Sequence, residues 1–322
     1  RSVSLIIQHS IIAVPNNNYV PRFDDPRVGY FMTQVTDMTS VSNTPYKDII
    51  HRWNLKKKDP ELPISEPVKP ITFWIENTTP IEFREAVKEG VLRWNKAFRT
   101  AGFKNALQVK TQPDDADWDA GDIRYNVLRW TSSPRPPFGG YGPSFVNPRT
   151  GEILGADIML EFVYFTNRVK YEKIYEELID NNNLIDNCLA GYYLNQGNQF
   201  GFVSSMASSY TDEVKKRIIN ESLIRLVLHE VGHTLGLNHN FKSSYLHDNT
   251  RVHNKGITQE MGLTGSVMEY PGVNIAPPEK EQGEYYTTTP GPYDKWAVEF
   301  GYSTALENSE LENSRINAIL SR

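Results

Sequence analysis

Residues 229–239 have the sequence HEVGHTLGLNH, which holds three of the seven histidines of the chain. The surrounding segment 212–237 contains no proline and has apolar residues at helical spacing, so we predict a helix there. Residues four apart in a helix point from the same face, one turn above the other. The imidazoles of His229 and His233 can therefore reach one metal ion.

Glu230 and Gly236 suggest further roles for this stretch, a general base beside the metal and a turn that ends the helix. Glu230 is rotated by about 100° from the first histidine, so it can reach a water molecule without binding the metal in line with the histidines. Gly236 tolerates the left-handed conformation that ends many helices. The three residues that follow it span about 10 Å. We therefore predict that the chain turns back at Gly236 and brings His239 to the metal as a third ligand.

Three neutral imidazoles with one open coordination position are typical of a catalytic zinc site. Zinc lowers the pKa of a bound water towards about 7 and polarises carbonyl groups. An amphipathic helix with incidental histidines is the alternative, but the register of Gly236 and His239 favours zinc. We therefore predict one catalytic Zn²⁺, Glu230 as the general base, and hydrolysis of an amide or ester.

The motif resembles that of the metzincin metallopeptidases, HExxHxxGxxH followed by a methionine turn. Residues 265–270, GSVMEY, are similar to that turn. The resemblance covers about residues 68–302. It implies that Met268 lies beneath the metal as a hydrophobic base. The alternative, a methionine that fills a gap in the core, is physically similar to that role. It also implies that Tyr270, as in astacin-like and serralysin-like members, binds the metal or stabilises the oxyanion. An ordinary half-buried tyrosine is the other interpretation.

The residue after the third histidine is Asn240, which departs from the proline, glutamate or aspartate found there in serralysins, astacins and adamalysins. The chain looks most like the large zinc-dependent metalloproteases of the Bacteroidetes, long classed as domains of unknown function. The segments DPRVGYF (25–31) and GPYDKWA (291–297) carry that similarity. Such relatives are exported, so the resemblance implies an extracytoplasmic location. Because the chain starts at Arg1, we expect a mature form or an excised piece.

The composition argues against nucleic-acid binding and against a transmembrane helix. A net charge of −5 and a pI near 5.9 argue against nucleic-acid binding, which needs a basic face. No apolar run reaches the length of about 18 residues that a transmembrane helix needs. The single cysteine, Cys188, excludes an internal disulfide, and we expect it to be a buried thiol.

We expect an α+β fold in which residues 1–66 are the tail of an upstream domain or a wrapping segment, and residues 67–322 form the catalytic domain. The alternation within 1–12 predicts a strand. The metzincin resemblance implies a twisted mixed five-stranded sheet, an active-site helix and a C-terminal helix. From the local patterns we place strands at 69–77, 106–112 and 123–130, a helix from a Thr79 cap to Gly102, and the last helix at 292–302.

Residues 141–147 and 153–162 are predicted to form a hairpin. The resemblance makes 141–147 the edge strand to which an extended polypeptide substrate adds, and an edge merely capped by a loop is the alternative. Residues 163–210 look like an insertion that contains a helix at 169–179.

Two further features of the sequence have weaker interpretations. The aspartate-rich loop 114–122 could suit Ca²⁺, but it lacks EF-hand spacing, so we expect a solvated loop there and also at 180–187. His247 and His253 are expected at the surface.

The leading hypothesis is a zinc endopeptidase. A zinc amidase acting on non-protein amides and a non-catalytic, zinc-stabilised binding module are the alternatives. Glu230 argues against the binding module, because a structural zinc site needs no base.

Overall fold

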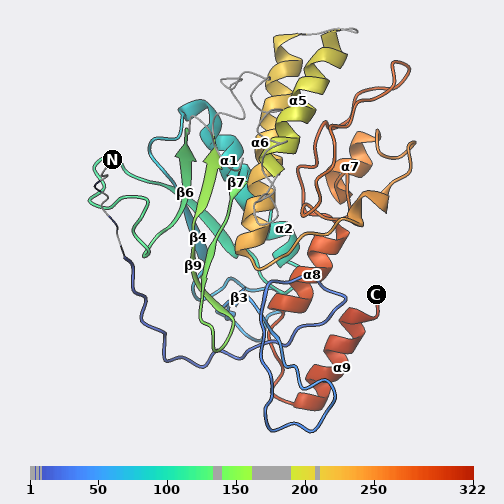
Figure 1. Ribbon diagram of the computed structural model, residues 1–322. Coiled ribbons are helices and arrows are strands. Elements are labelled where there is room, and N and C mark those ends of the chain that lie inside the picture. The colour runs from blue at the N-terminus through green and yellow to red at the C-terminus, as the bar shows by residue number, and fades with distance from the viewer. Residues whose placement is uncertain (1–3, 5–6, 8, 133–139, 162–189, 207–210) are drawn as a thin grey trace.

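The computed structural model describes residues 4, 7, 9–132, 140–161, 190–206 and 211–322 (Figure 1). The strands are β1 (Met32–Thr33), β2 (Ile49–Ile50), β3 (Arg52–Trp53), β4 (Ile71–Ile75), β5 (Leu107–Thr111), β6 (Asn126–Thr131), β7 (Gly140–Tyr141), β8 (Ser144–Val146), β9 (Glu152–Ala156) and β10 (Ile158–Glu161). The helices are α1 (Ile81–Leu92), α2 (Asn95–Phe98), α5 (Ala190–Met206), α6 (Asp212–Thr234), the 3₁₀ helix η2 (Ser243–Leu246), α7 (Lys255–Met261), α8 (Pro292–Tyr302) and α9 (Ser309–Leu320).

The main sheet is the mixed five-stranded sheet that was expected. Its strand order is β5-β4-β6-β10-β7. The pairs β5/β4, β4/β6 and β6/β10 are parallel, and only β7, at one edge, runs antiparallel to its neighbour. The predicted α+β class and the five-stranded sheet are therefore confirmed.

The sheet is joined to the active-site helix through α1. In β4, Ile71, Phe73 and Ile75 are buried while the residues between them are half-buried, which is the period of a strand with one core face. On α1, Gly90 lies against α6: a β-carbon on Gly90 would be 2.5 Å from the β-carbon of Val227. The missing side chain at Gly90 lets the two helix backbones approach closely.

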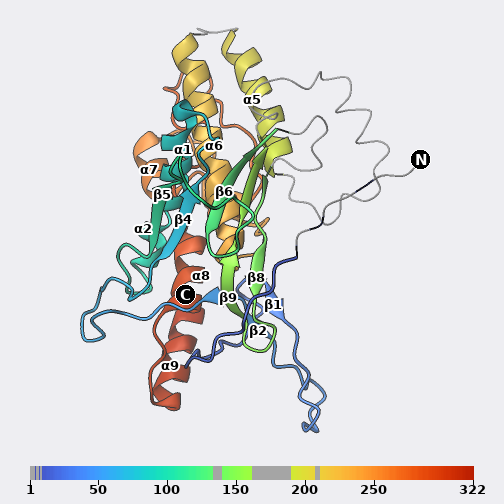
Figure 2. The ribbon, with the colours of Figure 1, turned by 90° about the vertical axis from the view of Figure 1, so that its left-hand side faces the viewer.

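Helix α6 crosses the interior of the molecule. Figure 1 shows α6 with α1 and the sheet on one side and with α7 and α8 on the other, and α5 runs beside its first half in both ribbon views (Figure 2). Every residue from Glu221 to Thr234 is buried. The predicted apolar stripe is present, yet the polar side chains of the last turns are enclosed as well.

The N-terminal segment is attached to a second sheet. This sheet has the order β3-β9-β8, and β3 runs parallel to β9. The Glu152 side chain at the start of β9 accepts hydrogen bonds from Asn17 and Asn54 at 2.9 and 3.1 Å. The division of the chain at residue 66 stays a prediction.

The predicted hairpin forms only in part. β8 pairs antiparallel with β9, but the expected continuous strand at 141–147 is wrong. Tyr141 belongs to the five-stranded sheet and Ser144 to the three-stranded sheet, with Gly142 and Pro143 between them. Proline has no N–H to offer a ladder, so the chain leaves one sheet there and enters the other. The second predicted strand is likewise divided at Asp157, between β9 and β10.

Two features of the helix predicted at 79–102 were also wrong. The helix at 79–102 is split into α1 and α2, and its N-cap is Pro80, with no side-chain cap from Thr79. Pro80 has an extended backbone and a side chain without a hydrogen-bonding group, so the helix starts uncapped. Residues 4, 7 and 9–12 form no strand, and Ile7 and Ile11 are exposed, while the rest of the predicted strand within 1–12 lies outside the described residues.

The helix predicted at 292–302 forms with these bounds, as α8, but the expectation that it is the last helix was wrong, because α9 follows it at Ser309–Leu320. Helix α5 falls within the predicted insertion. The predicted helix at 169–179, the loop at 180–187 and Cys188 lie outside the described residues. Within the described ranges, no helix has the length and apolar character to span a membrane.

Candidate metal centre

Both ends of helix α6 are defined by local features of the sequence. At its start, the hydroxyl of Thr211 accepts a hydrogen bond from the amide of Val214, and Asp212 lies in the first turn, where a negative charge is favoured. At its end, Leu235 is the C-cap and Gly236 has a φ of +92°. A side chain on Gly236 would collide with the carbonyl of His51, so both the conformation and the space there require glycine. The chain turns back at this point.

The turn brings the three histidines together. The ligand atoms of His229, His233 and His239 all lie within 4.8 Å of one another, and the rings of His229 and His233 are nearly perpendicular at 88°. His229 and His233 are buried and His239 is half-buried. Among the residues that the structure describes, this is the one cluster of three or more side chains suited to hold a metal ion.

Hydrogen bonds prepare two of the rings for a metal. Nδ1 of His229 lies 2.8 Å from the carbonyl oxygen of Val267, and Nδ1 of His233 lies 2.9 Å from that of Leu237. A carbonyl only accepts, so each Nδ1 carries the proton and each Nε2 keeps a lone pair. Nε2 of His229 is fully buried without a hydrogen-bond partner. A buried nitrogen left in this state fits a metal ligand.

Burial keeps the imidazoles neutral. It lowers the pKa of His229 well below the usual value, with a further contribution from His233. Burial lowers the pKa of His233 to about 3 and also lowers the pKa of His239. Because a histidine binds metal only when it is neutral, these shifts leave the site ready for a cation at physiological pH.

Glu230 lies between the ligands and the edge of the sheet. Its side chain is fully buried. A β-carbon on Gly140 of β7 would be 2.5 Å from its Oε1, so the carboxylate lies directly against the edge strand. A β-carbon on Gly142 would be 2.8 Å from the backbone carbonyl oxygen of Glu230. The two glycines therefore make room for Glu230 next to β7.

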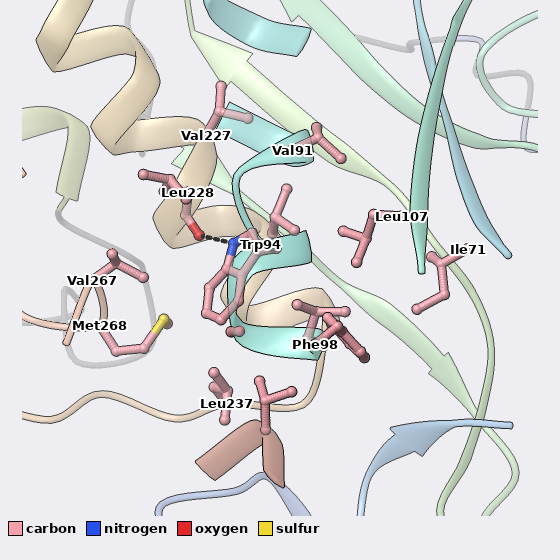
Figure 3. Packing of buried hydrophobic residues seen from close by; sticks show 14 of the residues in the cluster. Ile71, Val91, Trp94, Phe98, Leu107, Val227, Leu228, Leu237, Val267 and Met268 are labelled. Atoms are coloured by element: carbon pink, nitrogen blue, oxygen red, sulfur yellow. Dashed lines mark hydrogen bonds between the residues drawn. The ribbon is translucent and has the colours of Figure 1, made fainter. Parts of the chain in front are cut away.

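The methionine turn lies beneath the helix. Met268 is fully buried. Its sulfur occupies the space that a side chain on Gly232 would need, and Gly232 lies between His229 and His233 in the sequence. Figure 3 shows its sulfur turned towards Trp94, whose indole N–H donates to the Leu228 carbonyl at 2.9 Å. The Met268 carbonyl accepts from the amide of Asn240 at 3.1 Å. The turn is thus tied to the loop that follows the third histidine.

Tyr270 reaches the histidine cluster. Its hydroxyl lies 2.7 Å from Nε2 of His239, and its ring centroid is 5.2 Å from that of His229. Tyr193 of α5 stacks on the ring of Tyr270, and Phe241 lies against it at a tilt. A phenol at this position can donate a hydrogen bond or bind a metal.

Several residues at the site were not predicted from the sequence. The Phe31 ring packs against His233 with centroids 5.5 Å apart, and the indole N–H of Trp53 donates to the carbonyl of Thr234 at 2.7 Å. The buried Asp294 carboxylate accepts from the Val267 amide at 2.9 Å. Phe31 and Asp294 belong to the two segments, 25–31 and 291–297, whose family similarity was the signal that could have found them.

Other predicted features remain away from the histidine cluster. His247 and His253 are both half-buried rather than exposed at the surface as expected, and Nε2 of His247 lies 2.8 Å from the carbonyl oxygen of Gly262. A backbone acceptor close to the ring holds it inside its loop. In the loop 114–122, Asp119 accepts from the amide of Gly121 and Asp122 pairs with Arg124.

Two families of proteins match parts of the chain. A family described as Met-zincin matches residues 211–322, and a family described as a domain of unknown function (DUF5117) matches residues 1–58. No curated protein and no solved structure matches the chain significantly. The Met-zincin match includes the three histidines, Glu230 and the methionine turn.

The match and the geometry agree on the long motif and on the turn beneath it. Residues 211–322 are thus similar to the Met-zincin family, and His229, His233 and His239 within them lie within ligand distance of one another, as a metzincin motif requires.

Proposed function

We propose that this protein is a zinc-dependent endopeptidase. The observation that carries the proposal is the fully buried Glu230, placed between two buried neutral histidines and the edge strand β7. A structural zinc site needs no general base and usually fills all four ligand positions with protein side chains. When bound at the three histidines, a zinc ion would supply Lewis acidity, which polarises a carbonyl group and acidifies water.

Proton transfer falls to Glu230. As general base, it takes a proton from the attacking water and delivers it to the leaving amine when the peptide bond breaks. The amine then leaves as a neutral group, and the carboxylate is restored. The edge of β7 against Glu230 brings this proton acceptor next to any chain bound along the strand.

Tyr270 supplies a second polar group. Its hydroxyl lies within hydrogen-bond distance of the third histidine, close to where negative charge develops on the carbonyl oxygen. We assign to it donation of a hydrogen bond to that oxygen, which stabilises the transition state.

The substrate would be a polypeptide in extended conformation. Among the described residues β7 is the edge strand of the five-stranded sheet, and in this proposal the substrate adds to it as a further strand. Backbone pairing with β7 would hold a chain regardless of its side chains, which suits protein substrates better than small amides. The family resemblance also supports an extracytoplasmic location for this activity.

The experiment loads the purified chain with zinc and incubates it with casein and with a library of unstructured peptides. The proposal predicts internal cleavage that a chelator abolishes and added zinc restores. Zinc binding without cleavage of any peptide would favour a binding module, and turnover of small amides alone would favour an amidase.

A further inference from the structure

The segment matched by the family of unknown function pairs with the loop that carries the third histidine. Residues 28–31 run antiparallel to residues 236–238, with Tyr30 opposite Leu237. The amide of Phe31 donates to the carbonyl of Gly236 at 2.7 Å, and the amide of Asn238 donates to the carbonyl of Gly29 at 2.9 Å. We call residues 28–31 the N-terminal strap.

The strap also contacts a second ligand. Phe31 follows Tyr30 in an extended stretch, so its side chain points away from the buried Tyr30 ring and reaches His233. The Phe31 side chain is 39% exposed, which puts it at the border between the ligand ring and solvent. An apolar ring there restricts both the orientation of His233 and the access of water to it.

A third contact closes the end of α6. The last carbonyls of a helix have no partner within the helix. The indole N–H of Trp53 donates to the carbonyl of Thr234 at 2.7 Å, and the hydroxyl of Tyr302 donates to that of Leu235 at 2.8 Å. The amide of Trp53 in turn donates to the same hydroxyl at 3.3 Å. Trp53, before α6 in the sequence, and Tyr302, after it, thus fix the end of the helix that carries His229 and His233.

The strap itself is held firmly by α8. Tyr30 is buried, and its hydroxyl donates to the carbonyl of Ala297 at 2.8 Å. The amide of Gly29 donates to the hydroxyl of Tyr293 at 2.7 Å. Because α8 holds the strap in place, the strap in turn fixes the loop that carries His239.

We propose that the N-terminal segment 28–53 is part of the metal centre, with Phe31 and Trp53 as positioning residues. The strap fixes the loop that presents His239, Phe31 orients His233, and Trp53 fixes the end of the helix that carries the first two ligands. The inference rests on the proposed metal centre. It gives the region that matches the family of unknown function a role: it completes the ligand geometry of the metzincin region.

The test measures zinc affinity of the full chain by competition with a chelator of known affinity. Phe31→Ala removes the ring and keeps the strap amide, whereas Phe31→Pro removes both. Trp53→Phe keeps an aromatic ring and removes the donor to Thr234. Phe23→Ala is the matched control, because Phe23 is a phenylalanine just before this segment that is 59% exposed. Thermal unfolding of each metal-free protein shows whether the variant folds.

Loss of a supporting group around a metal ligand weakens metal binding by about 10- to 100-fold. We expect a loss of this size for Trp53→Phe and Phe31→Ala, and a larger one for Phe31→Pro, with kcat lowered more than KM changes. Phe23→Ala should bind zinc as the wild type does. If Phe31→Pro does not fold, the other two variants still decide the question.

A merely structural segment gives a different result. Variants that bind zinc as tightly as the wild type, while only their metal-free unfolding temperature falls, would overturn the inference. Failure of the wild type itself to bind zinc would instead contradict the proposed function, so the two failures are distinguishable.

Discussion

Asp294 and Val267 connect helix α8 to His229, the first of the three candidate metal ligands. Oδ2 of Asp294 accepts a hydrogen bond from the Val267 amide at 2.9 Å, and the Val267 carbonyl accepts one from Nδ1 of His229 at 2.8 Å. The same carboxylate accepts from the hydroxyl of Ser266 at 2.6 Å and from the amide of Gly291 at 2.7 Å. One buried carboxylate therefore holds the methionine turn from which His229 takes its orientation.

Replacing Asp294 tests this connection. Asp294→Asn keeps the size of the side chain, but its amide group can no longer accept all three hydrogen bonds. We expect zinc affinity to fall by about 10-fold, as for other groups that orient a metal ligand. Chelator competition measures the change. An unaltered zinc affinity in a folded Asp294→Asn protein would show that the methionine turn keeps its place without the carboxylate.

Asp294 also has a predicted pH dependence. Burial raises the pKa of its carboxyl group to about 6, above the value of 3.8 expected in the unfolded chain. The folded state then binds more protons than the unfolded state in this window, so the stability from this group is lost as pH rises from about 4 through 6. Denaturant unfolding of the metal-free wild type and of Asp294→Asn at several pH values measures it. The difference between the two proteins should change within that window and stay constant above it.

The ligand histidines should give the opposite pH dependence. Burial lowers the pKa of His233 to about 3, so in the metal-free protein the unfolded chain binds a proton below about 6.5 that the folded chain does not. Stability from this residue is lost as pH falls from about 6.5 to 3, at up to about 1.4 kcal/mol per pH unit. A metal-free His233→Gln variant should lack that part of the acid sensitivity. Identical acid profiles for the two proteins would contradict a neutral, buried His233.

Tyr270→Phe separates the two roles left open for this residue. If the hydroxyl donates to the developing oxyanion, kcat should fall by about 10²- to 10³-fold while zinc affinity and KM change little. Steady-state kinetics and chelator competition on the same preparations measure both quantities. A weaker zinc affinity in Tyr270→Phe would instead make the phenol a metal ligand.

Gly140→Ala tests the contact between the edge strand and the general base. The added methyl group would lie 2.5 Å from Oε1 of Glu230, so the carboxylate or the strand must move. A displacement of about 1 Å at a catalytic group costs on the order of 10²-fold in rate. Gly272→Ala is the control, since a β-carbon there meets nothing within 4 Å. Equal activity of the two variants would show that Glu230 does not need the space that Gly140 leaves.

The sequence was sufficient where the geometry is local. The spacing of His229 and His233 on one helix, and the left-handed turn at Gly236, follow from helix geometry and from the conformational freedom of glycine. The five-stranded sheet came from the family resemblance, and the local patterns placed β4, β5 and β6, whereas the predicted strands at 141–147 and 153–162 were each divided.

Contacts between distant parts of the chain were beyond the sequence. Trp53 and Thr234 are 181 positions apart, and nothing in either residue's neighbourhood indicates that they are hydrogen-bonded. Phe31 and Asp294 were within segments of recognised similarity, but their roles depend on which elements pack together. The division of 141–147 between two sheets likewise depends on tertiary packing rather than on local propensity.

We propose that Glu230 moves the proton in a hydrolysis that the three-histidine site makes possible. The decisive experiment compares zinc content and casein cleavage of the wild type with those of Glu230→Gln. The glutamine keeps the shape of the side chain and cannot accept the proton. We predict bound zinc in both proteins and cleavage only in the wild type. Equal cleavage rates in the two proteins would contradict the mechanism.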